Sequence, residues 1–232
     1  MTKPIFIFLL IMLLSCNSSK RENEPRKNDS IQSTLSSPVD KDSKILNLDF
    51  GFKVIALKEE DFEGFKTYSY FELRRNDSVL FTDSSAEYEF RDKLYPLILK
   101  TGNESFELLF EINDRPNKNY LNRLFINHDK VVAQDKLPTF IGKPADINKD
   151  GTKEYAGFMS YGQEYGGMVA YNPILYYSDT RTGLHLDSAL TRQRNELIYG
   201  RFYGFEYSEQ FEQFISVTKK FKEEVKLIEA HQ

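Results

Sequence analysis

Nine consecutive residues in the second half of the chain carry side chains that suit a divalent cation. Residues 146–154 have the sequence DINKDGTKE, in which oxygen-bearing side chains alternate at the start of the stretch. A hard dication such as Ca²⁺ takes about six to eight oxygen ligands at about 2.3 to 2.6 Å. The predicted ligands are Asp146, Asn148, Asp150, Thr152 through its main-chain carbonyl, and Glu154 directly or through a water. The sequence therefore predicts one structural calcium ion.

A metal-free turn is the alternative, because Asn, Asp and Gly are also the commonest turn residues. We favour calcium because a turn needs only one or two such residues, whereas here every ligand position is filled. The stretch is not an EF-hand, since Gly157 stands where a bidentate Glu is required and Pro138 and Pro144 disfavour an entering helix. Residues 154–159 instead suit a strand.

The wider stretch DINKDGTKEYAGFM resembles the calcium loop between strands in the FG-GAP and VCBS families of extracellular β proteins. In those families the loop usually repeats once per propeller blade, and here it occurs once. The resemblance implies a structural calcium site between two strands.

The segment after this strand is the predicted partner-binding surface. Residues 160–167, SYGQEYGG, combine glycines with tyrosines, which give a large contact area at low entropic cost. The alternative is a plain connection, because the chain has 14 tyrosines. The candidate contact residues are Tyr161, Gln163, Glu164 and Tyr165.

Catalysis finds little support in the sequence. The histidines are His128, His185 and His231, and no Ser-His-Asp set or histidine metal site can be recognised around them. Acidic pairs suitable for a glycosidase can be proposed anywhere among 35 acidic residues, and none is marked out. We therefore expect the protein to act by binding, with no catalytic residues.

The N-terminus has the features of a secretory signal. A short positive start is followed by the apolar residues 5–14, a run too short to span a membrane. The sequence LLSC at 13–16 resembles the lipobox of bacterial lipoproteins, and Cys16 is the only cysteine. We expect residues 1–15 to be removed and Cys16 to be acylated. The protein would then be held on the extracytoplasmic side of a membrane in the cell envelope.

Composition divides the mature chain into two parts. Residues 16–44 comprise the lipidated cysteine and a polar tether that cannot bury enough apolar surface to fold. Residues 45–232 are rich in aromatic and aliphatic side chains and are predicted to form a single β-rich domain. The net charge of −4 gives no reason to expect nucleic acid.

Short β-prone runs separated by turn residues predict antiparallel hairpins. The hairpin turns are expected at 74–78, 101–104, 127–130 and 179–183. This pattern is typical of an antiparallel sandwich or a small propeller-like sheet assembly. The last segment favours an amphipathic helix with Ser208 as its N-cap, although the same stretch also fits two strands.

A second resemblance concerns the order of segments from residue 141 to 205. A calcium loop, a glycine-rich loop, the tyrosine-rich strand 174–177, the turn DTRTG and then LDSAL are similar to small periplasmic calcium-binding inhibitors of lysozyme-like hydrolases. The resemblance implies an inhibitor or immunity-type partner of a cell-wall hydrolase, whose loop at 161–167 enters the enzyme cleft. The alternative is a general surface module that binds glycan or another envelope protein.

Overall fold

Antiparallel strands dominate the chain. The computed structural model describes residues 43–213 and 215–230, which lie within a compact unit spanning residues 39–232. Strands hold 50% of the described residues and helices 16%, so the predicted mainly β fold is confirmed. The predicted signal segment and Cys16 lie outside the described residues. None of the helices in the described ranges combines the length and the apolar character needed to cross a membrane.

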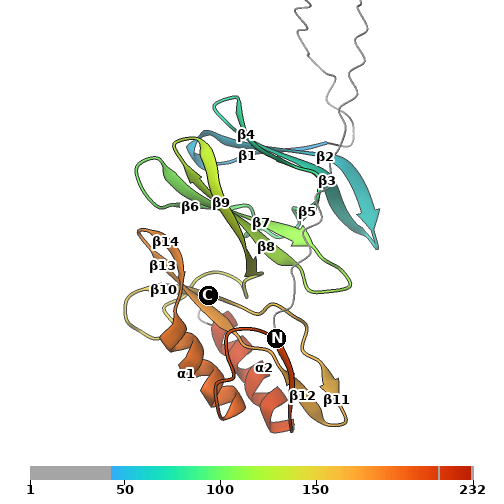
Figure 1. Cartoon of the computed structure of the whole chain (residues 1–232), viewed down its shortest axis with the longest axis vertical. Coiled ribbons are helices and arrows are strands. Elements are labelled where there is room, and N and C mark those ends of the chain that lie inside the picture. The colour runs from blue at the N-terminus through green and yellow to red at the C-terminus, as the bar shows by residue number, and fades with distance from the viewer. Residues whose placement is uncertain (1–42, 214, 231–232) are drawn as a thin grey trace, which may run out of the picture. The chain divides into compact units, whose positions relative to one another are not determined.

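The first half of the chain forms one large sheet of nine strands. These strands are β1 Lys44–Asn47, β2 Phe52–Phe62, β3 Phe65–Arg75, β4 Ser78–Asp83, β5 Glu87–Glu89, β6 Leu97–Lys100, β7 Ser105–Asn113, β8 Tyr120–Asn127 and β9 Lys130–Pro138, with a short 3-10 turn Asp49–Gly51 after β1. Strand β5 pairs with both β3 and β7 and joins the two halves of the sheet. The sheet folds over itself, with β1–β4 in one layer and β6–β9 in the other (Figure 1).

Aromatic side chains fill the space between these two layers. Phe71 of β3 lies 4.7 Å from Phe110 of β7, and Phe52 of β2 lies 5.1 Å from Phe106 of β7, measured between ring centroids. Because successive side chains of a strand point to opposite faces, Phe106, Leu108 and Phe110 face this core together. Leu109 faces the other way and belongs to a second core.

The second half of the chain adds two small sheets and two helices. One sheet contains β10 Lys153–Gly157, β13 Leu175–Thr180 and β14 Gly183–Leu186, and the other contains β11 Glu164–Tyr165, β12 Met168–Tyr171 and β15 Ser208–Gln213. The helices are α1 Ser188–Tyr199 and α2 Ile215–Ala230.

The first half of β13 is buried on both faces, because Leu175, Tyr176 and Tyr177 are consecutive large side chains that point alternately to the two sides of the sheet. Leu175 and Tyr177 pack in the second core with Leu109 and Leu121 of the large sheet. Tyr176 points to the opposite side, into a third core that includes residues of α1 and α2. The sheet β10-β13-β14 therefore lies between the large sheet and the helices.

The four predicted hairpins are confirmed as β3–β4, β6–β7, β8–β9 and β13–β14. The predicted C-terminal helix is also confirmed, but Ser208 is not its N-cap, because residues 208–213 form β15 and α2 begins at Ile215. Helix α1 was not predicted, although Asp187 caps its first turn by accepting a hydrogen bond from the N–H of Leu190 at 2.8 Å.

Candidate functional site

The predicted calcium loop follows β9, ends in the first two residues of β10 and is organised by its own side chains. Asp146 Oδ1 and Asn148 Oδ1 each accept a hydrogen bond from the N–H of Asp150 at 3.0 Å. Asp146 Oδ2 accepts from the N–H of Gly151 at 3.1 Å, and Asp150 Oδ1 accepts from the N–H of Thr152 at 2.7 Å. Gly151 has a φ of +90°, which provides the sharp bend. The side-chain oxygens of Asp146, Asn148 and Asp150 therefore all accept hydrogen bonds from main-chain N–H groups of residues 150–152.

Glu154 is the buried carboxylate of this loop, with 1% of its surface exposed. Its Oε2 accepts a hydrogen bond from the N–H of Ile147 at 2.9 Å, while Oε1 has no hydrogen-bond partner among the described residues. Burial raises the pKa of Glu154, and the negative charges of Asp150, Asp146 and Asp187 raise it further, against the effect of the Ile147 N–H. A buried carboxylate oxygen without a partner is costly unless a cation or donor satisfies it.

The donor set of the loop fits a calcium ion only in part. Within residues 43–213 and 215–230, no three Asp, Glu, His or Cys side chains converge as metal ligands. A complete shell would therefore need the amide oxygen of Asn148 and the main-chain carbonyl of Thr152 beside the carboxylates. The unpartnered Oε1 of Glu154 is the structural sign that favours a cation. Asp187 was not among the predicted ligands, and only its electrostatic effect on Glu154 draws attention to it.

The predicted partner-binding residues lie on the β11–β12 hairpin and the segment leading into it. Residues 161–167 are all exposed, and Tyr161 and Tyr165 have 58% and 76% of their surface in solvent. The hairpin turns through Gly166 and Gly167, both at positive φ, and β12 attaches it to β15. The structure thus brings the four candidates together at one exposed end, with Gln163 and Glu164 facing a pocket.

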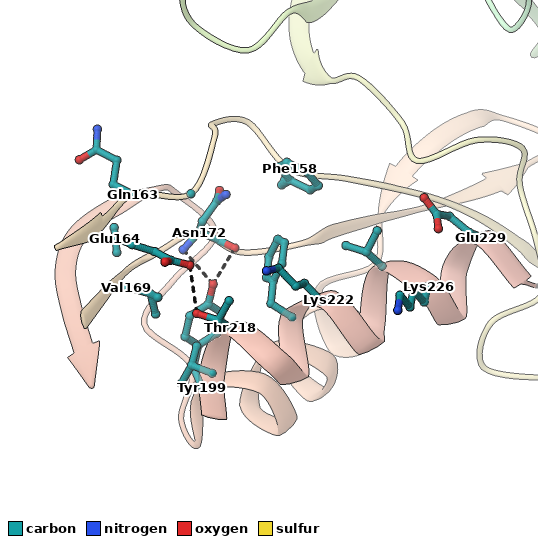
Figure 2. Close-up of a pocket in the computed structure, with 15 residues that line it drawn as sticks. Phe158, Gln163, Glu164, Val169, Asn172, Tyr199, Thr218, Lys222, Lys226 and Glu229 are labelled. Atoms are coloured by element: carbon teal, nitrogen blue, oxygen red, sulfur yellow. Dashed lines mark hydrogen bonds between the residues drawn. The ribbon is translucent and has the colours of Figure 1, made fainter. Parts of the chain in front are cut away.

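This pocket lies between the β11–β12 hairpin and helix α2 and is called the hairpin groove below (Figure 2). Its volume is about 450 Å³. The walls are mainly apolar and come from the segment after β10, from β12 and from α2. The apolar lining residues are Phe158, Val169, Ala170, Val217, Phe221 and Val225.

Charged side chains at the groove balance one another. Lys222 and Lys226 of α2 line it together with Glu164 and Glu229, which gives two positive and two negative groups. Thr218 of α2 donates a hydrogen bond to Glu164 Oε1 at 3.2 Å, so the hairpin and the helix are linked across the groove. The site is therefore apolar inside and carries no net charge among its lining residues.

Asn172 is a buried polar residue of the groove, with 2% of its surface exposed. Its Nδ2 donates to the carbonyl oxygen of Ser160 at 2.7 Å, and its main-chain N–H and C=O both pair with the hydroxyl of Tyr199. Its Oδ1 has no hydrogen-bond partner among the described residues. Since the Ser160 carbonyl can only accept, the amide orientation is fixed and Oδ1 is the atom left unpaired.

Helix α2, which forms one wall of the groove, is fastened by a buried polar cluster. Glu224 accepts two hydrogen bonds from the guanidinium of Arg194 on α1, at 2.7 and 2.5 Å. It also accepts one from the hydroxyl of Tyr176 on β13 at 2.5 Å. Burial is the main cause that raises the pKa of Tyr176 far above its usual range, and the negative charge of Glu224 raises it further. Phe221 of the same helix packs edge to face on Phe158, with ring centroids 5.4 Å apart.

Comparison with known proteins gives no family assignment: no protein-family model, no curated protein and no solved structure matches this chain. The resemblance of residues 146–159 to FG-GAP and VCBS loops therefore stays a prediction, as does the likeness to hydrolase inhibitors.

The sequence did not predict the groove itself. Asn172, Phe221 and Val225 are separated by up to 53 positions from one another and carry no motif. The one signal available was the apolar face of α2, which by itself indicates only that the helix packs against something.

Proposed function

We propose that this protein is a lipid-anchored binding protein of the bacterial cell envelope that captures a protein partner at the hairpin groove. The observation that carries the proposal is the apolar groove of about 450 Å³, whose lining residues Gly162, Gln163 and Glu164 stand in sequence between the exposed Tyr161 and Tyr165. Apolar pockets flanked by tyrosines are typical of interfaces in which a few buried anchors supply most of the binding energy.

The composition of the groove favours a protein partner over a sugar and over a reaction. A sugar would bury several hydroxyls against Val169, Val217 and Val225, where they would find no partners. Among the groove's described lining residues there is no histidine, cysteine or serine, and the carboxylate of Glu164 is hydrogen-bonded to Thr218. Shape and apolar contact are what this site offers.

A calcium ion in the 146–154 loop would have a structural role in this binding protein. Asp146, Asn148, Asp150, Thr152 and Glu154 would hold it. Calcium would supply a positive charge next to the unpartnered Oε1 of Glu154. Glu154 belongs to β10, and the segment directly after β10 carries Phe158 into the groove. Ordering of β10 by the ion would thereby stiffen one wall of the binding site.

Within this class, a lysozyme-like hydrolase is the partner that the resemblance of residues 141–205 suggests. The exposed hairpin tip at 161–167 is the part that would enter an enzyme cleft. The negative net charge of −4 would favour association with a basic enzyme.

The central test is binding and inhibition measured with a purified hydrolase. Envelope extract passed over the immobilised protein should yield one stoichiometric partner. That partner, once purified, should bind the double variant Tyr161→Ala/Tyr165→Ala at least about tenfold more weakly, a typical effect for aromatic anchors. Val132→Ala is the matched control, because Val132 is 62% exposed on β9 and distant in sequence. Equal binding by the hairpin variant and the control would refute a binding role for the hairpin.

The anchor is tested separately. Cys16→Ser should move the protein from the membrane to the soluble fraction, because acyl chains on this residue would be the only membrane attachment that we propose. Unchanged membrane fractionation would exclude lipidation at Cys16.

A second candidate function, glycan binding, is favoured by a different cavity. A cleft of about 640 Å³ between β4 and the strands β8 and β9 is lined mostly by polar side chains, including Thr82, Asn122, Gln134 and Lys136, and contains the ring of Tyr120. Sugar binding there would be revealed by glycan-array binding that Gln134→Ala weakens and Tyr161→Ala leaves unchanged.

A further inference from the structure

The hairpin groove is long and narrow. Its lining residues on α2 run from Val217 to Glu229, which corresponds to about 18 Å of helix at about 1.5 Å per residue. Figure 2 shows Thr218, Lys222 and Lys226 in succession along this helix. A volume of about 450 Å³ spread over that length gives a mean cross-section of about 25 Å². The groove therefore suits one thin, extended group.

This shape excludes the usual peptide ligands of a groove. A helix with its side chains is about 10 to 12 Å wide, and an extended strand occupies about 4.8 Å by 10 Å. The main-chain N–H and C=O groups of a strand would also face the apolar side chains of Val169, Phe221 and Val225 without partners. An unbranched hydrocarbon chain is thin and brings no polar group into the groove.

The charged residues at the groove favour a negative group at one end of such a chain. Lys222 and Lys226 are exposed, stand one helical turn apart and form no ion pair with any of the described residues. Of the two lining glutamates, Glu164 already accepts a hydrogen bond from Thr218 at the hairpin end. Glu229 lies in the last turn of α2, beyond both lysines.

We infer that the hairpin groove binds a fatty acid, with the alkyl chain lying along α2 and the carboxylate at Lys222 and Lys226. Each methylene group buried against Val169, Phe221 and Val225 raises the affinity about fourfold. This ligand goes beyond the proposed function, and the inference does not rest on the capture of a protein partner. Because both would occupy one groove, a bound fatty acid would compete with the side-chain anchors of that partner.

The experiment compares octanoate, decanoate and 1-decanol by titration calorimetry. The protein used is the predicted mature chain, residues 16–232, with Cys16→Ser, so that neither its own acyl chains nor detergent competes for the groove. Decanoate should bind about 15-fold more tightly than octanoate, because it buries two more methylene groups. It should bind at least about threefold more tightly than 1-decanol, which has the same chain length without the charge.

Paired variants test the two parts of the ligand. Lys222→Ala/Lys226→Ala should weaken decanoate binding at least about threefold and leave 1-decanol binding unchanged. The matched control is Lys219→Ala/Lys220→Ala, which removes the same charge from the same helix outside the groove lining and should change neither.

The alkyl chain is tested by filling the groove. Val225→Phe should abolish binding of decanoate and 1-decanol, whereas Val132→Phe, on an exposed position of β9, should leave both unchanged. If Val225→Phe does not fold, the comparison of the three ligands on the unfilled groove decides the question by itself.

Absence of decanoate binding would overturn the inference, and so would equal affinities for decanoate and 1-decanol or for decanoate and octanoate. Equal losses in the two lysine pairs would overturn it as well, since they would reveal attraction to the net charge of α2 alone. These outcomes differ from failure of the proposed function, which is judged by the hairpin-dependent capture of a hydrolase.

Discussion

The calcium loop and the hairpin groove differ in how the chain builds them. The loop consists of nine consecutive residues whose hydrogen bonds join positions two to seven apart, such as Asp146 to Asp150 and Ile147 to Glu154. The groove gathers residues from 158 to 229, and its wall α2 is fastened to α1 by an ion pair between residues 30 positions apart. The loop is thus a local structure, while the groove depends on the packing of the whole second half.

This difference should determine which substitutions or conditions disrupt each region. A local loop is damaged by changes in its backbone conformation or by removal of an ion that it binds, such as the proposed calcium, and the rest of the fold can survive. A groove assembled from distant elements is damaged by any change that releases one of its walls.

Glu224→Ala should lower the free energy of unfolding by about 3 to 5 kcal/mol, because it leaves the half-buried guanidinium of Arg194 without its partner. Urea denaturation measures the effect. The neighbouring Glu223→Ala is the control, since Glu223 is 61% exposed and lies 3.8 Å from Lys219, and we expect a change below about 0.5 kcal/mol. Similar losses in the two variants would show that the ion pair does not hold α2.

Calcium bound at residues 146–154 should raise the free energy of unfolding by somewhat less than Glu224→Ala lowers it. At about 100 times its dissociation constant, calcium would raise the free energy of unfolding by about 2.7 kcal/mol, and extracellular sites commonly bind at about 10⁻⁴ to 10⁻³ M. Thermal melting in calcium and in chelator measures the shift. Identical melting in both conditions would rule out the site.

Glu154→Gln separates the effect of calcium binding from the effect that the Glu154 carboxylate itself has on the free energy of unfolding. We expect this variant to lose the response to calcium, because an amide is a poorer ligand, and to be more stable than the wild-type protein in chelator, because it removes a carboxylate whose pKa is raised by burial. A variant less stable in chelator would mean that the Glu154 carboxylate contributes to the fold without a metal.

Gly151→Ala should cost about 1 to 2 kcal/mol, because Gly151 has a φ of +90° and an L-residue is strained there even though the surrounding space is open. Gly162→Ala, in the segment before the hairpin, also meets open space but needs no positive φ, so we expect less than about 0.5 kcal/mol. Chemical denaturation of both variants tests whether the loop is the conformationally demanding region.

A pH dependence is expected from Lys118, whose ammonium lies 4.7 Å from the ring centroid of Phe158. Burial lowers the pKa of Lys118 to about 8, while the charge of Glu111 opposes this. Between that pH and the unfolded pKa of about 10.4, the unfolded chain binds more protons, so stability rises with pH. The stability of wild type relative to Lys118→Met should therefore increase across this window, and a constant difference would contradict it.

The sequence by itself determined the features that depend on near neighbours. Alternating apolar residues and turn residues such as Asn76 and Asp77 specify hairpins, because register and turn geometry are set within a few residues. The turn residues of the 146–154 loop could be recognised for the same reason, and their local hydrogen bonds are present, while calcium binding there stays a prediction. The helical periodicity of the last segment was correct from Ile215 onward.

Tertiary structure alone decided the rest. Residues 208–213 become β15 because β12 offers a strand to pair with, although their own pattern also fits a helix. The groove, the burial of Glu154 and the unpaired oxygen of Asn172 arise only when segments distant in sequence pack together and exclude water. Burial and hydrogen-bond satisfaction are properties of that packed surrounding, so no local pattern of residue types specifies them.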